Sequence, residues 1–211
     1  MLERRHAMSN LRLHEIISSS LKKREKLQNR ETSLIRLIDG QGDNLDGHIL
    51  ESYGKGWLIS TSGSNLRSDV REILSSYEKP LYWKRLDQHQ KESPIHLCGE
   101  ELPEFFYGLE NGLRCRLSFK SGYSQGIFID QRNNREALRN MVKPGQTVLN
   151  TFAYTGFFSI AAAAAGAVHF FPRPLTSLPR LDPRELSPQR HGPHKSLLLQ
   201  RRHLPLAPSL C

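Results

Sequence analysis

Hydrophobic and polar positions divide the chain into a helix, a group of short strands and a strand–turn–helix unit. Residues 10–30 carry apolar side chains at helical spacing between basic ones, which predicts an amphipathic helix. The apolar positions of this stripe are Leu11, Leu13, Ile16, Ile17, Leu21 and Leu27. We interpret the basic side, with Lys22, Lys23, Arg24 and Lys26, as a solvated face, and a face that contacts RNA is the alternative.

Residues 32–62 change to short apolar runs between Gly, Asp and Asn turns, which predicts a small antiparallel sheet. The expected strands are 33–38, 48–53 and 57–61. A helix over 68–77 and a strand over 80–85 should follow. We interpret Asp39 and Asp43 as turn-forming acids, because no series of further calcium ligands follows them.

Residues 105–132 predict a hairpin or paired strands. Asn111-Gly112 is a dipeptide typical of tight hairpin turns, and the residues after it alternate with period two. Cys115 lies in the second of these strands, where a buried structural thiol is expected. A helix over 134–142 should follow and end before Pro144.

Charge and composition exclude several classes of protein. The net charge of +9 comes from 30 Lys/Arg and 21 Asp/Glu, but residues 168–211 hold seven of the basic side chains and only two of the acidic ones. Basicity is therefore weak evidence for nucleic-acid binding. Three scattered cysteines predict neither a disulfide framework nor a metal site. Because no signal peptide or membrane-spanning run is visible, we expect a cytoplasmic protein without membrane contact.

Residues 146–165 have the pattern of a strand, a glycine turn and a small-residue helix. Val148 and Leu149 are expected to end a buried strand, and Gly156 permits a tight turn with backbone N–H groups open to a ligand. Alanines 161–165 favour a helix that packs closely on a sheet. This is the first half of a nucleotide-binding βαβ unit, although it lacks the three-glycine dinucleotide pattern and the P-loop lysine.

The run at 148–157, Val-Leu-Asn-Thr-Phe-Ala-Tyr-Thr-Gly-Phe, resembles the S-adenosylmethionine (SAM) loop of class I ribosomal RNA methyltransferases. It is most similar to the enzymes that make 5-methylcytosine in large-subunit rRNA and to related guanine-N7 enzymes. A second block, at 122–135, resembles the family's Phe-x-Asp-Gln-Arg-x-x-Arg segment, which helps form the cofactor pocket. The resemblance implies SAM as cofactor. Its candidate binding residues are Asn150, Phe152, Tyr154, Thr155 and Gly156 from the loop, and Phe128, Asp130, Gln131, Arg132 and Arg135 from the upstream block.

The resemblance covers about residues 30–167 and implies a small α+β N-terminal domain followed by the start of an α/β Rossmann-like methyltransferase domain. The domains expected are an N-terminal helix, a small β-rich α+β domain, the start of the methyltransferase domain and a tail. Their boundaries are 1–30, 31–104, 105–167 and 168–211.

The family's second strand, with an acid for the cofactor's ribose hydroxyls, should follow Ala167. Prolines recur from Pro172 onward, which argues against a central sheet strand there. We interpret residues 168–211 as a disordered Pro/Arg-rich tail that is read out of frame. A natural basic tail that touches RNA phosphates is the alternative.

The implied function is a SAM-dependent methyltransferase acting on a base of ribosomal RNA, with this chain an inactive truncated form. The family's 5-methylcytosine chemistry needs a cysteine nucleophile. None of Cys98, Cys115 and Cys211 lies where the family has it, so the catalytic residues are unknown. The alternative is a non-catalytic RNA-binding protein that uses residues 10–110 and the basic tail.

Overall fold

The computed structural model describes residues 2–86, 92–122, 124–151 and 153–170, with no account of the side chains of residues 2–9, 169 and 170. The chain begins with a long helix, α1 (Leu2–Arg24), followed by a short 3-10 turn, η1 (Glu25–Leu27). Leu13 and Ile17 are buried, whereas Leu11 is 67% exposed and Leu27 is 44% exposed. The predicted stripe is therefore wrong at these last two positions. Successive helical residues turn by about 100°, so Leu11 lies far around the helix from Leu13, and Leu27 lies beyond the α-helix.

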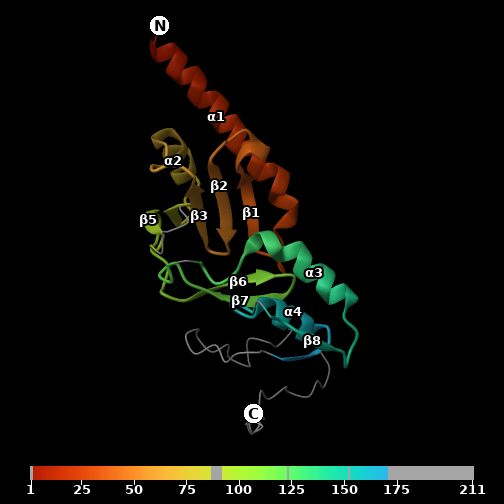
Figure 1. Cartoon of the computed structure of the whole chain (residues 1–211). Coiled ribbons are helices and arrows are strands. Elements are labelled where there is room, and N and C mark those ends of the chain that lie inside the picture. The colour runs from red at the N-terminus through yellow and green to blue at the C-terminus, as the bar shows by residue number, and fades with distance from the viewer. Residues whose placement is uncertain (1, 87–91, 123, 152, 171–211) are drawn as a thin grey trace, which may run out of the picture.

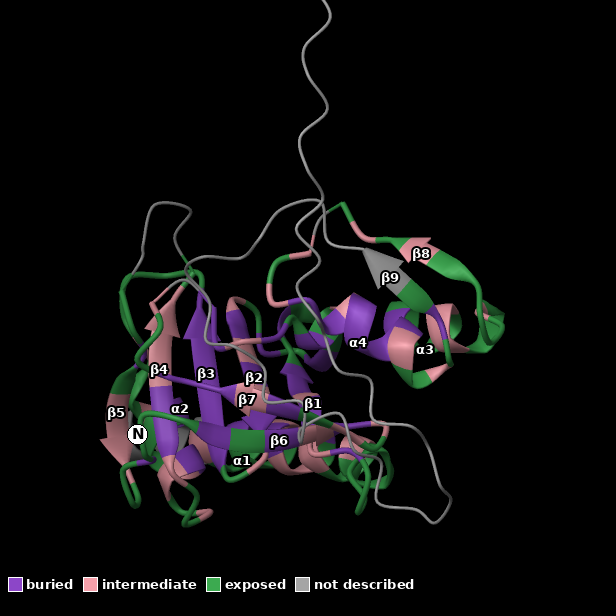
Figure 2. Ribbon diagram, turned by 90° about the horizontal axis from the view of Figure 1, so that it is seen from below, coloured by how far each residue is buried: buried purple, intermediate pink, exposed green. Residues whose placement is uncertain are grey.

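A five-stranded sheet follows, in the order β1-β2-β3-β4-β5 (Figures 1 and 2). Its strands are β1 (Leu34–Asp39), β2 (His48–Tyr53), β3 (Gly56–Thr61), β4 (Leu81–Arg85) and β5 (Ile95–Cys98). The first three strands pair antiparallel, as the sequence predicts. Helix α2 (Ser68–Ser75) crosses over between β3 and β4, so that pair is parallel. Strand β5 is not among the strands that the sequence predicts.

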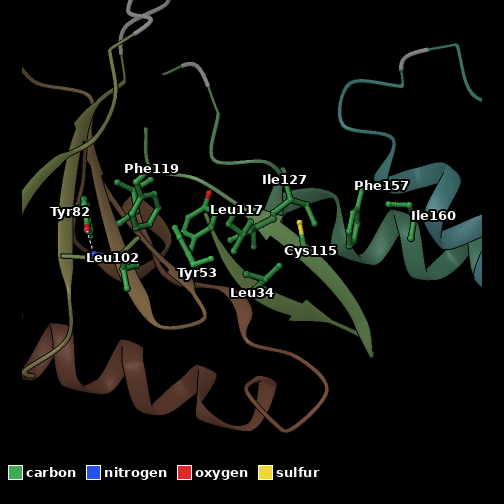
Figure 3. Packing of buried hydrophobic residues seen from close by; sticks show 13 residues of the cluster. Leu34, Tyr53, Tyr82, Leu102, Cys115, Leu117, Phe119, Ile127, Phe157 and Ile160 are labelled. Atoms are coloured by element: carbon green, nitrogen blue, oxygen red, sulfur yellow. Dashed lines mark hydrogen bonds between the residues drawn. The ribbon is translucent and has the colours of Figure 1, made fainter. Parts of the chain in front are cut away.

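The two faces of this sheet have different coverings. Helices α1 and α2 contribute Leu13, Ile17, Val70 and Leu74 to a hydrophobic cluster on one face. The other face carries a hairpin made of β6 (Phe106–Glu110) and β7 (Leu113–Leu117). Figure 3 shows the cluster beneath it, which joins sheet, hairpin and the next helices. Its members are Leu34, Tyr53, Leu58, Tyr82, Leu102, Phe106, Cys115, Leu117, Phe119, Ile127, Ile129, Phe157 and Ile160.

The hairpin has the turn that its sequence predicts. Asn111 has a φ of 48° and Gly112 a φ of 79°, and two successive positive values are typical of a type I′ turn. Cys115 is 2% exposed, which confirms the expected buried thiol. The hydrophobic cluster continues across the boundary predicted between residues 104 and 105, so the hairpin packs on the sheet as well as on later segments of the chain.

The last described part of the chain is a small α/β unit. It consists of η3 (Ile129–Gln131), α3 (Arg132–Met141), β8 (Thr147–Leu149), α4 (Phe157–Ala164) and β9 (Val168–Phe170). Strand β9 pairs in parallel with β8, which completes a β–α–β arrangement. The expected strand, glycine turn and helix are therefore confirmed, and α3 begins two residues before the predicted helix.

Two expectations about this unit are wrong. A strand does follow Ala167, because the three residues of β9 precede Pro172 and supply the backbone groups that pair with β8. Strand β8 is not buried: Leu149 is 63% exposed, since only β9 pairs with it in the described part of the chain (Figure 2). The remaining tail, residues 171–211, lies outside the described residues.

Candidate functional site

The two family-like sequence blocks meet at one pocket of about 520 Å³. It lies between the segment that leads into α3 and the loop that leads into α4. Five of the candidate residues line it, namely Phe128, Gln131, Arg135, Tyr154 and Thr155. The other lining residues are Ile127, Thr151, Ala153, Phe157 and Phe158. Its volume is within the range of small-molecule sites.

Aromatic side chains form one side of the pocket. The ring centroids of Phe128 and Tyr154 are 5.0 Å apart, with the planes tilted by 46°. Phe128 is 45% exposed and Tyr154 is 37% exposed, so both rings are accessible to a ligand. Tyr154 also has a φ of 45°, a left-handed conformation that a bulky residue seldom adopts. Such strain is concentrated at binding and catalytic sites.

The start of α4 supplies backbone donors. Gly156 precedes the helix with a φ of 82°, which a glycine adopts without strain. The first helical bond runs from the Ile160 N–H to the Gly156 carbonyl, so the N–H groups of Phe157, Phe158 and Ser159 have no acceptor within the helix. These groups and the helix dipole favour an anionic or polar ligand group. Asn150 does not line the pocket, but donates from its Nδ2 to Ser159 Oγ at 3.0 Å and so ties the end of β8 to α4.

Arg135 is held by a buried carboxylate. Its Nε donates to Glu110 Oε1 at 2.6 Å and its Nη2 to Glu110 Oε2 at 2.7 Å. Both side chains are almost fully buried, at 4% and 2% exposed. Arg135 also donates to the Phe128 carbonyl at 2.8 Å, and its guanidinium lies 5.5 Å from the ring centroids of both Phe157 and Phe158. This pair therefore joins the hairpin, the segment before α3 and the start of α4.

Two candidates from the upstream block lie elsewhere. Asp130 and Arg132 line a different pocket of about 290 Å³, beside Arg24, Arg36 and Asp39. Asp130 accepts a hydrogen bond from Gln131 at 3.0 Å. The structure thus does not bring them to the aromatic pocket. Phe152 lies outside the described residues.

The upstream block is continuous in sequence, but only some of its residues reach the pocket. In the structure, the pocket residues Phe128, Gln131 and Arg135 follow at intervals of three and four residues, which is the spacing of one helix face. That periodicity could have separated them from Asp130 and Arg132. Glu110 was also missed, although the alternation of the hairpin places it on the same inward face as Phe106.

The described residues contain no group of three or more His, Cys, Asp and Glu side chains that could hold a metal ion. In the same part of the chain, no helix has the length and apolar character needed to cross a membrane.

Comparison with known proteins identifies the family. Residues 84–180 match the sequence model of a family described as S-adenosylmethionine-dependent methyltransferase, and the match continues past Ala167. Residues 84–180 therefore have the sequence of a SAM-dependent methyltransferase. The matched residues include the hairpin, both blocks that form the pocket, and α4.

Relatives of the chain carry rRNA in their names. A candidate ribosomal RNA large subunit methyltransferase of Bacillus subtilis, YwbD, is 36% identical over 65% of this chain and 37% of its own length. Ribosomal RNA large subunit methyltransferase I of Shewanella frigidimarina is 33% identical over 63% of this chain and 36% of its own length.

Among solved structures, a candidate SAM-dependent methyltransferase of Streptococcus mutans matches with a TM-score of 0.65 and 32% identity. The match covers 75% of this chain and 43% of that one. The structure of a candidate methyltransferase complexed with S-adenosylhomocysteine (SAH) gives the same TM-score and identity, and the match covers 42% of that chain. The chain therefore spans less than half the length of these relatives.

Proposed function

We propose that the aromatic pocket binds SAM and that the protein transfers a methyl group to a base of ribosomal RNA. The observation that carries this proposal is the convergence of two separate sequence blocks, both typical of the family, on one pocket.

The residues of the pocket fit the chemistry of such a cofactor. SAM consists of a planar adenine, a ribose, and a sulfonium-bearing amino acid, and it supplies an electrophilic methyl group when bound. The exposed rings of Phe128 and Tyr154 offer apolar faces for a planar base and electron-rich faces for a cation. The N–H groups before Ile160 suit a carboxylate or hydroxyl oxygen.

The other residues fix this geometry. Arg135 forms an ion pair with Glu110 and donates to the Phe128 carbonyl, so we assign it to shaping the wall of the pocket and not to pairing with a ligand carboxylate. Asn150 holds the loop before α4 against that helix through Ser159. A wall held in this way loses little conformational entropy when a ligand binds.

The substrate part of the proposal rests on the relatives, which are named as methyltransferases of large-subunit ribosomal RNA. A base must leave its stack to approach a pocket of this kind. No catalytic residue is assigned within the described residues.

The test is a titration of SAH into the chain, followed by calorimetry, with two tyrosine variants. Tyr154→Ala removes a ring from the pocket, and loss of one stacked ring should weaken binding about 5- to 100-fold. Tyr107→Ala is the matched control, because Tyr107 is 38% exposed and lies on the hairpin, outside the pocket. The proposal fails if the folded chain does not bind SAH, or if the two variants bind it equally well.

A further inference from the structure

The outward face of the β6–β7 hairpin carries aromatic and basic side chains. Alternation along the strands turns Phe106, Cys115 and Leu117 toward the core, so Tyr107 and Arg114 point the opposite way. Arg116, paired with Tyr107 across the ladder, belongs to the same outward face. The sequence beside β6 adds Phe105, and this ring is 39% exposed.

Each arginine of this face lies over an aromatic ring. The guanidinium of Arg114 is 3.7 Å from the ring centroid of Tyr107, and that of Arg116 is 3.7 Å from the ring centroid of Phe105. Phe105 and Tyr107 are two residues apart at the start of β6, and Arg114 and Arg116 are two residues apart on β7. The same stacked unit is therefore repeated along the hairpin, about 7 Å apart.

No carboxylate among the described residues neutralises the charges of these arginines. Arg24, Arg36, Arg67 and Arg135 form ion pairs with acids, whereas neither Arg114 nor Arg116 has an acid within 4.0 Å in the described part of the chain. The Nε of Arg116 is buried and finds no hydrogen-bond acceptor among the described residues.

We propose that this hairpin face binds single-stranded RNA, with bases stacked on its ring and guanidinium planes and phosphates bound by Arg114 and Arg116. This rests on the proposed function, because that function supplies the RNA that would bind here. Aromatic rings interleaved with guanidinium groups are the common means of holding unpaired bases and their backbone. A protein partner would instead be expected to bring carboxylates to this face.

The spacing favours unpaired nucleotides. Stacked bases in a duplex rise by about 3.4 Å, roughly half the interval between the two stacked units, so neighbouring bases would have to be splayed apart. The face is also connected to the pocket. The Ser118 N–H donates to the Gln125 carbonyl at 3.2 Å, and the chain then continues through Ile127 to Phe128 of the pocket wall.

The experiment measures binding of a short, labelled single-stranded RNA to the full chain by fluorescence anisotropy, between about 50 and 200 mM salt. In Arg114→Gln/Arg116→Gln two phosphate contacts are lost. The slope of log Kd against log salt should then fall by about 1.4, at about 0.7 for each contact to a single strand. Tyr107→Ala should weaken binding about 5- to 100-fold at unchanged slope, because it removes a stacking surface and no charge.

The matched control is Arg71→Gln/Lys79→Gln, which removes the same charge from exposed positions on α2 and the turn after it. Helix α2 covers the opposite face of the sheet, so this variant should keep the slope and affinity of the unmodified chain. Circular dichroism of every variant confirms that it is folded.

Equal slopes in the hairpin and control variants would overturn the inference, as would Tyr107→Ala binding with unchanged affinity. SAH titrations of the same variants separate it from the proposed function. If SAH binds normally but the hairpin variants bind RNA as the unmodified chain does, only the inference fails. If RNA binding depends on the hairpin and SAH does not bind, the proposed function fails and the RNA surface stands.

Discussion

Replacing Glu110 by glutamine should strongly destabilise the protein, although the two side chains have nearly the same shape. Glu110 is 2% exposed and binds Arg135 through both carboxylate oxygens, at 2.6 and 2.7 Å. The substitution leaves the guanidinium buried with only a neutral acceptor. Breaking one side of a buried ion pair costs about 3–5 kcal/mol, because the remaining charge cannot regain its hydration.

That cost is a large part of the stability of a typical domain, which is about 5–15 kcal/mol. It should be recovered in Glu110→Leu/Arg135→Met, where both charges are replaced by apolar side chains of similar length. With the single variants Glu110→Leu and Arg135→Met, this double variant forms a thermodynamic cycle, so the coupling between the two residues is measured directly.

Urea unfolding followed by tryptophan fluorescence gives the free energies, with Glu101→Gln as the control. Glu101 pairs with Lys120 at 3.9 Å, and both side chains are more than 60% exposed. Its substitution should change the free energy of unfolding by less than about 1 kcal/mol. The reasoning is refuted if Glu110→Gln is as mild as this control.

Two further predictions concern stability. Burial raises the pKa of Asp43, but hydrogen bonds from Arg24 and from the Asp39 N–H, together with the charges of Arg24 and Lys23, outweigh it and leave that pKa below the usual 3.8. The folded protein therefore gains stability from ionised Asp43 above pH 3.8 and loses it as pH falls further. In urea titrations, the free energy of unfolding should fall less steeply with decreasing pH in Asp43→Asn than in the unmodified chain. An equally steep fall in both proteins would contradict this. Gly108→Ala should cost about 1–3 kcal/mol in the same assay, because a Cβ there would lie 2.3 Å from Leu34 Cδ2. Gly63→Ala, with nothing within 4 Å, should stay within about 0.5 kcal/mol, and an equal loss in both variants would contradict the packing argument.

The strands and helices with strong local signals could be predicted from the sequence. Asn111-Gly112 fixes the hairpin turn because both residues tolerate positive φ, and Gly156 marks the start of α4 for the same reason. Strand β5, with only four residues in Ile95–Cys98, carries too little alternation to be found. The exposure of Leu149 depends on which strands lie beside β8, and no local pattern contains that information.

The candidate site shows the same division. The two family-like blocks were found from their residue types, and the structure joins Phe128 and Tyr154 across the pocket. The direction of each side chain depends on the turn that η3 and α3 make, so Gln131 faces the pocket while Asp130 and Arg132 do not. Glu110 was missed because it comes from the hairpin, and its partnership with Arg135 exists only in three dimensions.

The most direct test of the cofactor pocket is the shift of backbone amide resonances when SAH is added to isotope-labelled chain. The account predicts the largest shifts at Phe128, Gln131 and Thr155 and at the first turn of α4, with little change in β1–β3 on the far side of the hairpin. Shifts concentrated outside the pocket, or their absence at saturating SAH, would contradict it.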